Sequence, residues 1–185
     1  MKPTIHSGKL LTGQDLWALG DTGLSELVAG RLVAVGPATN THGRVLAAIS
    51  TLLYKFVEKQ DVGRLAVGGV GIYTQRDPDT IRAADLLFIA HERLAQIKTD
   101  DFLDVPPNLI VEVLSPSDSW STVTQKLREY FAAGVELVWV ADPEVNIVYA
   151  YRSLTDVREF TEEDDLPGDD ILPGFSVPVA SLFEI

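Results

Sequence analysis

Three charged residues at the centre of the chain carry the strongest chemical signal. Asp85 opens one apolar run, Glu112 lies inside another, and Lys126 follows Glu112 by fourteen residues. Side chains alternate between the two faces of a strand, so Glu112 shares its face with Ile110 and Leu114. A carboxylate between aliphatic neighbours loses hydration and needs a cation or strong hydrogen-bond donors beside it. The pattern therefore predicts a positively charged partner for Glu112.

Two carboxylates on neighbouring strands would create an oxygen-rich metal site. Sequential strands often pair, and pairing of the strand Asp85–Ile89 with the strand Asn108–Leu114 would bring Asp85 and Glu112 to one edge of a sheet. With the backbone carbonyl of Val113 they would form an all-oxygen site suited to Mg²⁺ or Mn²⁺. Because such an ion polarises a phosphoryl oxygen and acidifies a bound water, the expected chemistry is phosphodiester hydrolysis.

The helix expected after Glu112 can supply a positive charge. Within a helix from about Ser119 to Ala133, Lys126 and Tyr130 lie one turn apart along the margin of an apolar stripe. An inward-facing ammonium would neutralise the charge that grows on a transition state and help to orient the water. For each residue alone, a structural ion pair is the alternative. The combination of two carboxylates and a lysine favours catalysis.

The elements expected around these residues describe an α/β domain with a mixed sheet flanked by helices. Short and long helices are expected after the capping residues Thr12 and Asn40. The first two strands form an N-terminal β-hairpin turning at Ala29-Gly30, and a crossover joins the strand of Glu112 to the strand 136–141. Gly68-Gly69 indicates a hairpin turn or a bulge. The expected strands cover residues 24–28, 31–35, 65–67, 70–74, 85–89, 108–114, 136–141, 146–151 and 157–161, with short further strands near the C-terminus.

Composition limits the class of protein. A chain of 185 residues, 46% hydrophobic, suits a single domain over residues 1–185. The net charge of −12 argues against a surface that grips a polyphosphate everywhere, although half of the excess falls between residues 158 and 170. The absence of cysteine excludes disulfides and thiolate metal sites. No signal-like or membrane-length apolar segment occurs, so we expect a soluble, cytoplasmic protein without membrane contact.

Other candidate sites are weaker. The three histidines, His6, His42 and His91, lack the spacing of a zinc site. His42 either borders the cleft or is a polar residue in the first turn of a helix. Ser115 lacks the flanking glycines of a nucleophile elbow, which favours a turn over residues 115–118.

Several longer strings are specific enough to indicate a family. They are residues 112–118 (EVLSPSD), 125–130 (QKLREY), 133–135 (AGV) and 138–143 (VWVADP), with 26–30 (ELVAG), His42 and 172–175 (LPGF) further away. Together they resemble the putative restriction-endonuclease family of the PD-(D/E)XK nuclease superfamily, and the likeness runs nearly end to end.

The resemblance implies a restriction-endonuclease-like core in which Asp85 and Glu112 are the acidic metal ligands. The usual lysine two residues after the second acid would fall on Leu114, and Lys126 on the next helix takes its place. Ala84 stands where proline is common. Arg31 stands where many relatives are acidic, which leaves a third metal ligand from the first hairpin open. The implied site neighbours are Tyr130, His42 and Glu26.

The implied function is a Mg²⁺-dependent endonuclease that acts on nucleic acid, with DNA preferred to RNA and a homodimer expected by analogy. Two alternatives remain at this point. One is a catalytically silent binding module with the same fold, and the other is a nuclease subunit that needs a targeting protein.

Overall fold

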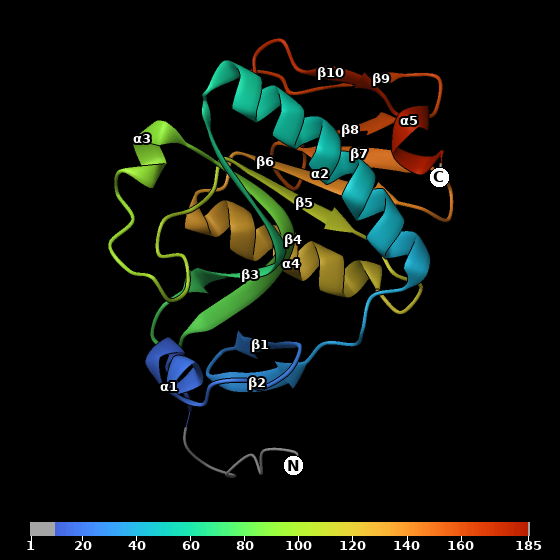
Figure 1. Cartoon of the computed structure of the whole chain (residues 1–185). Helices are drawn as coiled ribbons and strands as arrows, with labels where there is room; N and C mark the ends of the chain where they lie inside the picture. Colours follow the sequence, from blue (N-terminus) through green and yellow to red (C-terminus); the bar gives the residue numbers. More distant parts are fainter. Residues whose placement is uncertain (1–9, 185) are drawn as a thin grey trace.

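The computed structural model describes residues 10–184 and has a large mixed sheet with helices on both faces (Figure 1). Eight strands form this sheet in the order β2-β1-β4-β5-β6-β7-β8, with β3 paired to the other edge of β4. The expected α/β architecture is confirmed, including the N-terminal hairpin and the extra C-terminal strands. Among the described residues, no helix combines the length and apolar character needed to cross a membrane.

The helices are α1 (Gly13–Ala18), α2 (Asn40–Gln60), α3 (His91–Leu94), α4 (Trp120–Ala133) and α5 (Ala180–Phe183). The strands of the large sheet are β1 (Ser25–Val28), β2 (Arg31–Ala34), β3 (Gly63–Gln75), β4 (Thr80–Ala90), β5 (Leu109–Val113), β6 (Leu137–Asp142), β7 (Ile147–Tyr151) and β8 (Val157–Phe160). A separate antiparallel pair consists of β9 (Asp165–Pro167) and β10 (Ser176–Pro178).

Local signals in the N-terminal half produce the expected elements, with one correction. Thr12 and Asp15 form a capping box at α1, and β1 and β2 pair through a turn at Ala29-Gly30, both with positive φ. The helix α2 is capped by Thr39 rather than by Asn40. The Thr39 hydroxyl accepts a hydrogen bond from the backbone of His42 while Thr39 keeps an extended conformation, so Asn40 is already the first helical residue.

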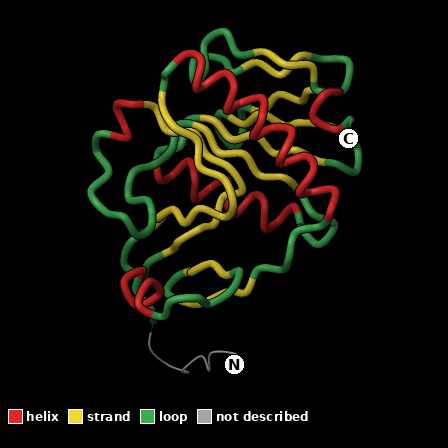
Figure 2. Tube along the Cα trace, viewed as in Figure 1, coloured by secondary structure: helices red, strands yellow, loops and turns green. Residues whose placement is uncertain are grey.

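The two long helices cover opposite faces of the sheet (Figure 2). Under α2, Val45 and Ile49 share a core with Trp139 of β6, and α5 and the β9–β10 pair close the same face. Under α4, Leu127 packs on a second core that includes Ile110 of β5. β5 and β6 are parallel neighbours, which confirms the crossover through α4.

The long hairpin of β3 and β4 differs from the sequence prediction. The two expected short strands form one strand, β3, which continues through Gly68-Gly69, and β4 begins at Thr80, so Asp85 lies in the middle of its strand instead of at its start. Pairing shifts between Val67 and Val70, so the two glycines oppose Asp85 alone. This is a bulge, and Gly68 and Gly69 have φ of 101° and 73°, values that favour glycine.

The bulge changes the side-chain alternation of β4. Leu86 and Phe88 face the core under α2, whereas Ala84 joins the core under α4. The two halves of the strand are therefore out of phase, and the phase changes at Asp85. Asp85 itself has no partner in the described ladders with β3 or β5. The simple alternation assumed from the sequence does not hold at this residue.

One edge of β4 is shared by two strands with a gap between them. β1 pairs with it at Ile81 and β5 pairs further along. Within the gap the N–H of Ala83 donates to the Glu26 carboxylate, and Asp85 accepts the N–H of Val113 from the end of β5. Carboxylates thus satisfy backbone donors that no neighbouring strand reaches.

The bulge predicts a measurable cost for adding a side chain. Gly68→Ala should lower the free energy of unfolding by about 1–2 kcal/mol, because an L-residue is forced into positive φ although the space is open. Urea denaturation measures the change. Gly36→Ala is the matched control, since it has open space without positive φ, and it should be neutral or slightly stabilising. Equal effects at the two positions would contradict the role of the bulge.

Candidate active site

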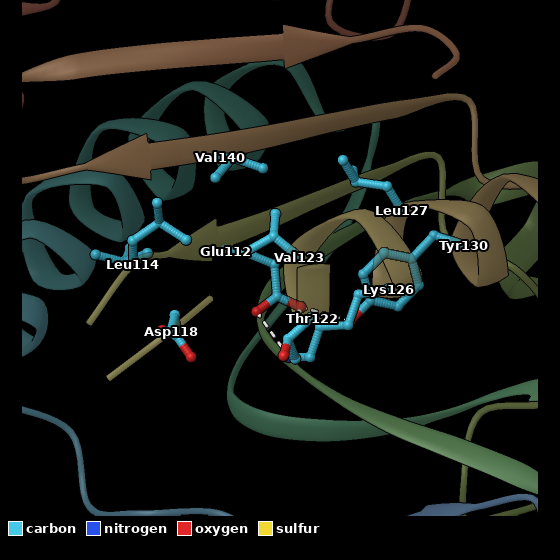
Figure 3. Close-up of a pocket in the computed structure, with 10 residues that line it drawn as sticks. Glu112, Leu114, Asp118, Thr122, Val123, Lys126, Leu127, Tyr130 and Val140 are labelled. Carbon is cyan, nitrogen blue, oxygen red and sulfur yellow. Dashed lines mark hydrogen bonds and ion pairs between the residues drawn. The ribbon is translucent and has the colours of Figure 1, made fainter. Parts of the chain in front are cut away.

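Glu112 lies at the centre of the site and is held by two side chains of α4 (Figure 3). The Lys126 Nζ donates to both Glu112 oxygens at 3.3 and 3.1 Å, and the Tyr130 hydroxyl donates to Oε1 at 2.5 Å. The side chain of Glu112 is 12% exposed. The structure therefore brings together the strand carboxylate and the helix lysine that the sequence singled out, with Tyr130 one turn beyond.

The carboxylates around Lys126 favour its positively charged form. Burial alone would lower the pKa of Lys126, but the carboxylates of Glu112 and Glu26 raise it above its usual value. Lys126 is therefore an ammonium at neutral pH and cannot serve as a general base there. It can donate hydrogen bonds and positive charge.

Burial also sets the states of the two partners. It raises the pKa of Glu112, opposed by the charge of Lys126 and reinforced by that of Asp85. Burial and the neighbouring Glu112 raise the pKa of Tyr130 well above its usual value. Tyr130 therefore remains a hydroxyl donor that orients the Glu112 carboxylate. An additional cation beside Glu112 would favour its ionised form.

Asp85 and His42 form a second group beside Glu112. Asp85 Oδ2 accepts the backbone N–H of Val113 at 2.8 Å, next to Glu112 in the chain, and its Oδ1 is 3.4 Å from Nε2 of His42. The hydrogen bond with Asp85 raises the pKa of His42 above its usual value despite burial. On the other side of the ring, Nδ1 lies 3.3 Å from the Ser115 hydroxyl. His42 thus faces the carboxylates, not solvent.

Glu26, expected as a neighbour of the site, is buried and only 5% exposed. Its Oε1 lies 3.3 Å from Nζ of Lys126 and accepts the N–H of Ala83 at 3.1 Å, while its Oε2 accepts from Arg82 at 2.7 Å. Burial alone would raise the pKa of Glu26, but Lys126 and Arg82 outweigh it and lower the pKa below its usual value. With these three donors engaged, Glu26 is an internal counter-ion, whereas Arg31 of the same hairpin is exposed.

Arg82 and Glu129 belong to the site and were missed by the sequence reasoning. The Arg82 guanidinium, 6% exposed, donates to Glu129 of α4 at 2.5 and 2.9 Å and to Glu26 of β1 at 2.7 Å. The available signal was a charged residue inside an apolar strand, which must find anionic partners when buried. The identity of those partners is not encoded locally.

The balance of charge leaves room for a cation. Four carboxylates, those of Glu26, Asp85, Glu112 and Glu129, face two permanent cations, Lys126 and Arg82. If all four carboxylates are ionised, two negative charges remain with His42 neutral and one remains with His42 protonated, the form that its raised pKa favours. A bound metal ion would offset this excess.

The donor set fits a hard ion that keeps water ligands. Among residues 10–184, no group of three or more His, Cys, Asp and Glu side chains is placed to hold a metal. Mg²⁺ commonly binds through one or two carboxylates and several waters, and each carboxylate has about four lone-pair positions. Asp85 and Glu112 can therefore accept an ion in addition to their present donors. The carbonyl of Val113 as a third ligand stays a prediction.

A small pocket opens beside Glu112, and its lining includes Thr122 and Lys126 (Figure 3). Its volume of about 30 Å³ accommodates one or two water molecules and excludes a nucleotide. Asp118 at its rim accepts the N–H of Ser115, as expected for a turn. Any group larger than one or two water molecules must therefore lie outside this pocket. Of the other histidines, His91 lies away at α3 and His6 is outside the described residues.

Comparisons with known proteins agree with the fold and with the family that the sequence resembles. A family model described as "Uma2: Putative restriction endonuclease" matches residues 16–180. A crystal structure of a putative nuclease belonging to DUF820 from Anabaena variabilis ATCC 29413 is similar with a TM-score of 0.79 and 19% sequence identity, covering 94% of this chain and 98% of that chain. This likeness confirms the expected fold class. No curated protein matches the chain.

The buried arginine predicts a pH-dependent stability. Arg82→Met should cost about 3–5 kcal/mol at neutral pH, because two mostly buried carboxylates lose their partner. Folding lowers the pKa of Glu26 below its ordinary value of 4.5. Its ionised carboxylate therefore stabilises the folded state at a pH above 4.5, and this contribution is lost as the pH falls through the lower pKa of the folded state. The cost should therefore shrink below about pH 4.5, as measured by urea denaturation across pH.

The control for this series is Arg64→Met, which removes an exposed ion pair with Asp61. Its cost should stay below about 1 kcal/mol at every pH. A cost of Arg82→Met that is equally small, or that does not change with pH, would show that the network contributes little to folding.

Proposed function

The chain belongs to this family of putative restriction endonucleases, and from that premise we propose that it is a Mg²⁺-dependent endonuclease that hydrolyses phosphodiester bonds of nucleic acid, with DNA as the substrate. The observation that carries the proposal is the contact between Glu112 and Lys126 in a largely buried region with excess negative charge. Metal-assisted phosphodiester cleavage uses carboxylates to hold the ion and gains from a positive group near the reacting phosphate.

The two carboxylates have the binding role. Asp85 and Glu112 would hold the ion, with the carbonyl of Val113 as the proposed further ligand. When bound, Mg²⁺ supplies Lewis-acid activation of the phosphoryl oxygen and a more acidic water. Tyr130 keeps the Glu112 carboxylate in one orientation through its hydroxyl, so its contact is with the ligand and not with the phosphate.

Lys126 has the charge-stabilising role. As an ammonium it donates hydrogen bonds toward the phosphoryl oxygens and offsets the negative charge that develops during attack. His42, held by Asp85, limits the motion of that carboxylate.

The acidic balance favours one refinement of this proposal. With a net charge of −12, the chain alone attracts a polyanion poorly, so a targeting protein would supply the grip on DNA. A homodimer would carry two active sites related by a two-fold axis, one for each strand of a duplex. The silent binding module is the outcome that remains if no cleavage occurs.

Metal binding should stabilise the fold. At a Mg²⁺ concentration about a hundred times the Kd, mass action contributes about 2.7 kcal/mol, which raises Tm by about 5–10 °C for a domain of this size. Glu112→Gln should remove most of this shift, whereas Glu144→Gln, at an exposed acid outside the site, should retain it. A thermal scan with equal shifts in both variants would reject the site.

Cleavage should require the metal and depend on the lysine. Lys126→Met should reduce turnover by about 10²–10³-fold while keeping the Mg²⁺-induced rise in Tm, because the lysine acts on the transition state and the carboxylates bind the ion. The exposed Lys55→Met is the matched control. Assays at low salt with DNA and RNA substrates measure the rates, since phosphate contacts are strongest there.

Three outcomes distinguish the alternatives. Undiminished metal-dependent cleavage by Lys126→Met would reject the role of the lysine. Activity in the double variant Asp85→Asn, Glu112→Gln would identify a contaminating nuclease. No cleavage of DNA or RNA, with metal binding intact, would favour the silent binding module or a subunit that requires its partner.

A further inference from the structure

The ammonium of Lys126 has two carboxylate neighbours, and only one of them is a proposed metal ligand. Glu112 lies 3.1 Å away and is the proposed metal ligand, whereas Glu26 lies 3.3 Å away. A metal ion on Glu112 would share the oxygens that now accept from Lys126, and its positive charge would repel the ammonium. The contact with Glu26 does not face that competition.

Glu26 is fixed by donors from a different part of the fold. Arg82 holds one of its oxygens at 2.7 Å and the backbone of Ala83 holds the other at 3.1 Å. Both donors come from β4, and Glu26 itself comes from β1. The carboxylate therefore keeps its position without help from Glu112.

The same arginine also fixes the helix that carries the lysine. Glu129 accepts two hydrogen bonds from Arg82 and lies three residues after Lys126 on α4. Arg82 thus sets the distance between the Glu26 carboxylate and the helix turn of Lys126. The arrangement has the rigidity that a positioned catalytic group requires.

We infer that Glu26 is the positioning residue that keeps the Lys126 ammonium at the reacting centre when Glu112 is engaged by the metal, an inference that rests on the proposed function. Glu26 acts through Lys126 and does not bind the ion, because two cations, Arg82 and Lys126, already flank its carboxylate and would repel a third, whereas Glu112 pairs with Lys126 alone among the described residues. The first hairpin therefore contributes a holder for the lysine in place of a third metal ligand.

The position of the Lys126 ammonium can be tested by a measurement that does not depend on nuclease activity. Among the lysines of residues 10–184, Lys126 alone is not exposed, so its ammonium protons should exchange slowly with water and give a signal in ¹H–¹⁵N NMR that disappears in Lys126→Met. In Glu112→Gln the signal should persist, because Glu26 still holds the group. In Glu26→Gln, proton exchange should accelerate at least about tenfold, in line with the loss of a charged partner.

Glu144→Gln, at an exposed acid outside the site, is the control, and the Lys126 ammonium signal should remain in it. Circular dichroism establishes that each variant is folded. Loss of the signal in Glu112→Gln would overturn the inference, and so would an unchanged exchange rate in folded Glu26→Gln. The Glu112→Gln arm decides the matter even if Glu26→Gln does not fold.

Kinetics supply a readout that a purely structural role would not give. Glu26→Gln should lower kcat by about 10²-fold, and adding it to Lys126→Met should cost little more, because both changes remove the same function. Fully additive losses would overturn the inference. An inactive wild-type protein with the expected NMR results would reject the proposed function and leave the positioning by Glu26 supported.

Discussion

Arg82 and Lys126, two largely buried cations, form ion pairs with carboxylates beside a stretch of β4 whose edge has no strand partner. Between β1 and β5, one edge of β4 has no neighbouring strand, and this is where Arg82 reaches Glu26 and Glu129. Removing one charge from such a network leaves another unpaired in a poorly hydrated region. The same requirement that joins β1, β4 and α4 also brings Lys126 to Glu112, so folding and the candidate chemistry share their contacts.

Much of the architecture follows from local signals. The helix expected from about Ser119 to Ala133 is observed as α4, with Ser119 as its N-cap and Gly134 ending it in a left-handed conformation. The contact of Lys126 with Glu112 was also predictable, because a parallel crossover lays the helix back over the strand that precedes it. The exact N-cap of α2 was not, since two neighbouring residues, Thr39 and Asn40, both have capping side chains and only the backbone conformation distinguishes them.

The remainder depends on contacts between distant segments. Arg82 and Glu129 are 47 residues apart, and each taken alone is an ordinary charged residue. The position of Asp85 within β4 depends on whether Gly68-Gly69 turns the chain or bulges it, and the glycines permit both conformations. The expectation of a strand opening at Asp85 was wrong because the antiparallel partner, β3, supports pairing on both sides of the bulge.

The phase change in β4 also limits how the chain length can vary. Because Ala84 and Leu86 belong to different cores, one residue added or removed between the two pairings of β4 would exchange the core-facing sets of one half of the strand. Apolar side chains would then meet the wrong helix, and the carboxylate of Asp85 would leave Val113. A residue inserted into or deleted from this strand should consequently disturb both cores at once, whereas the same change in a connection outside the strand leaves both cores in register.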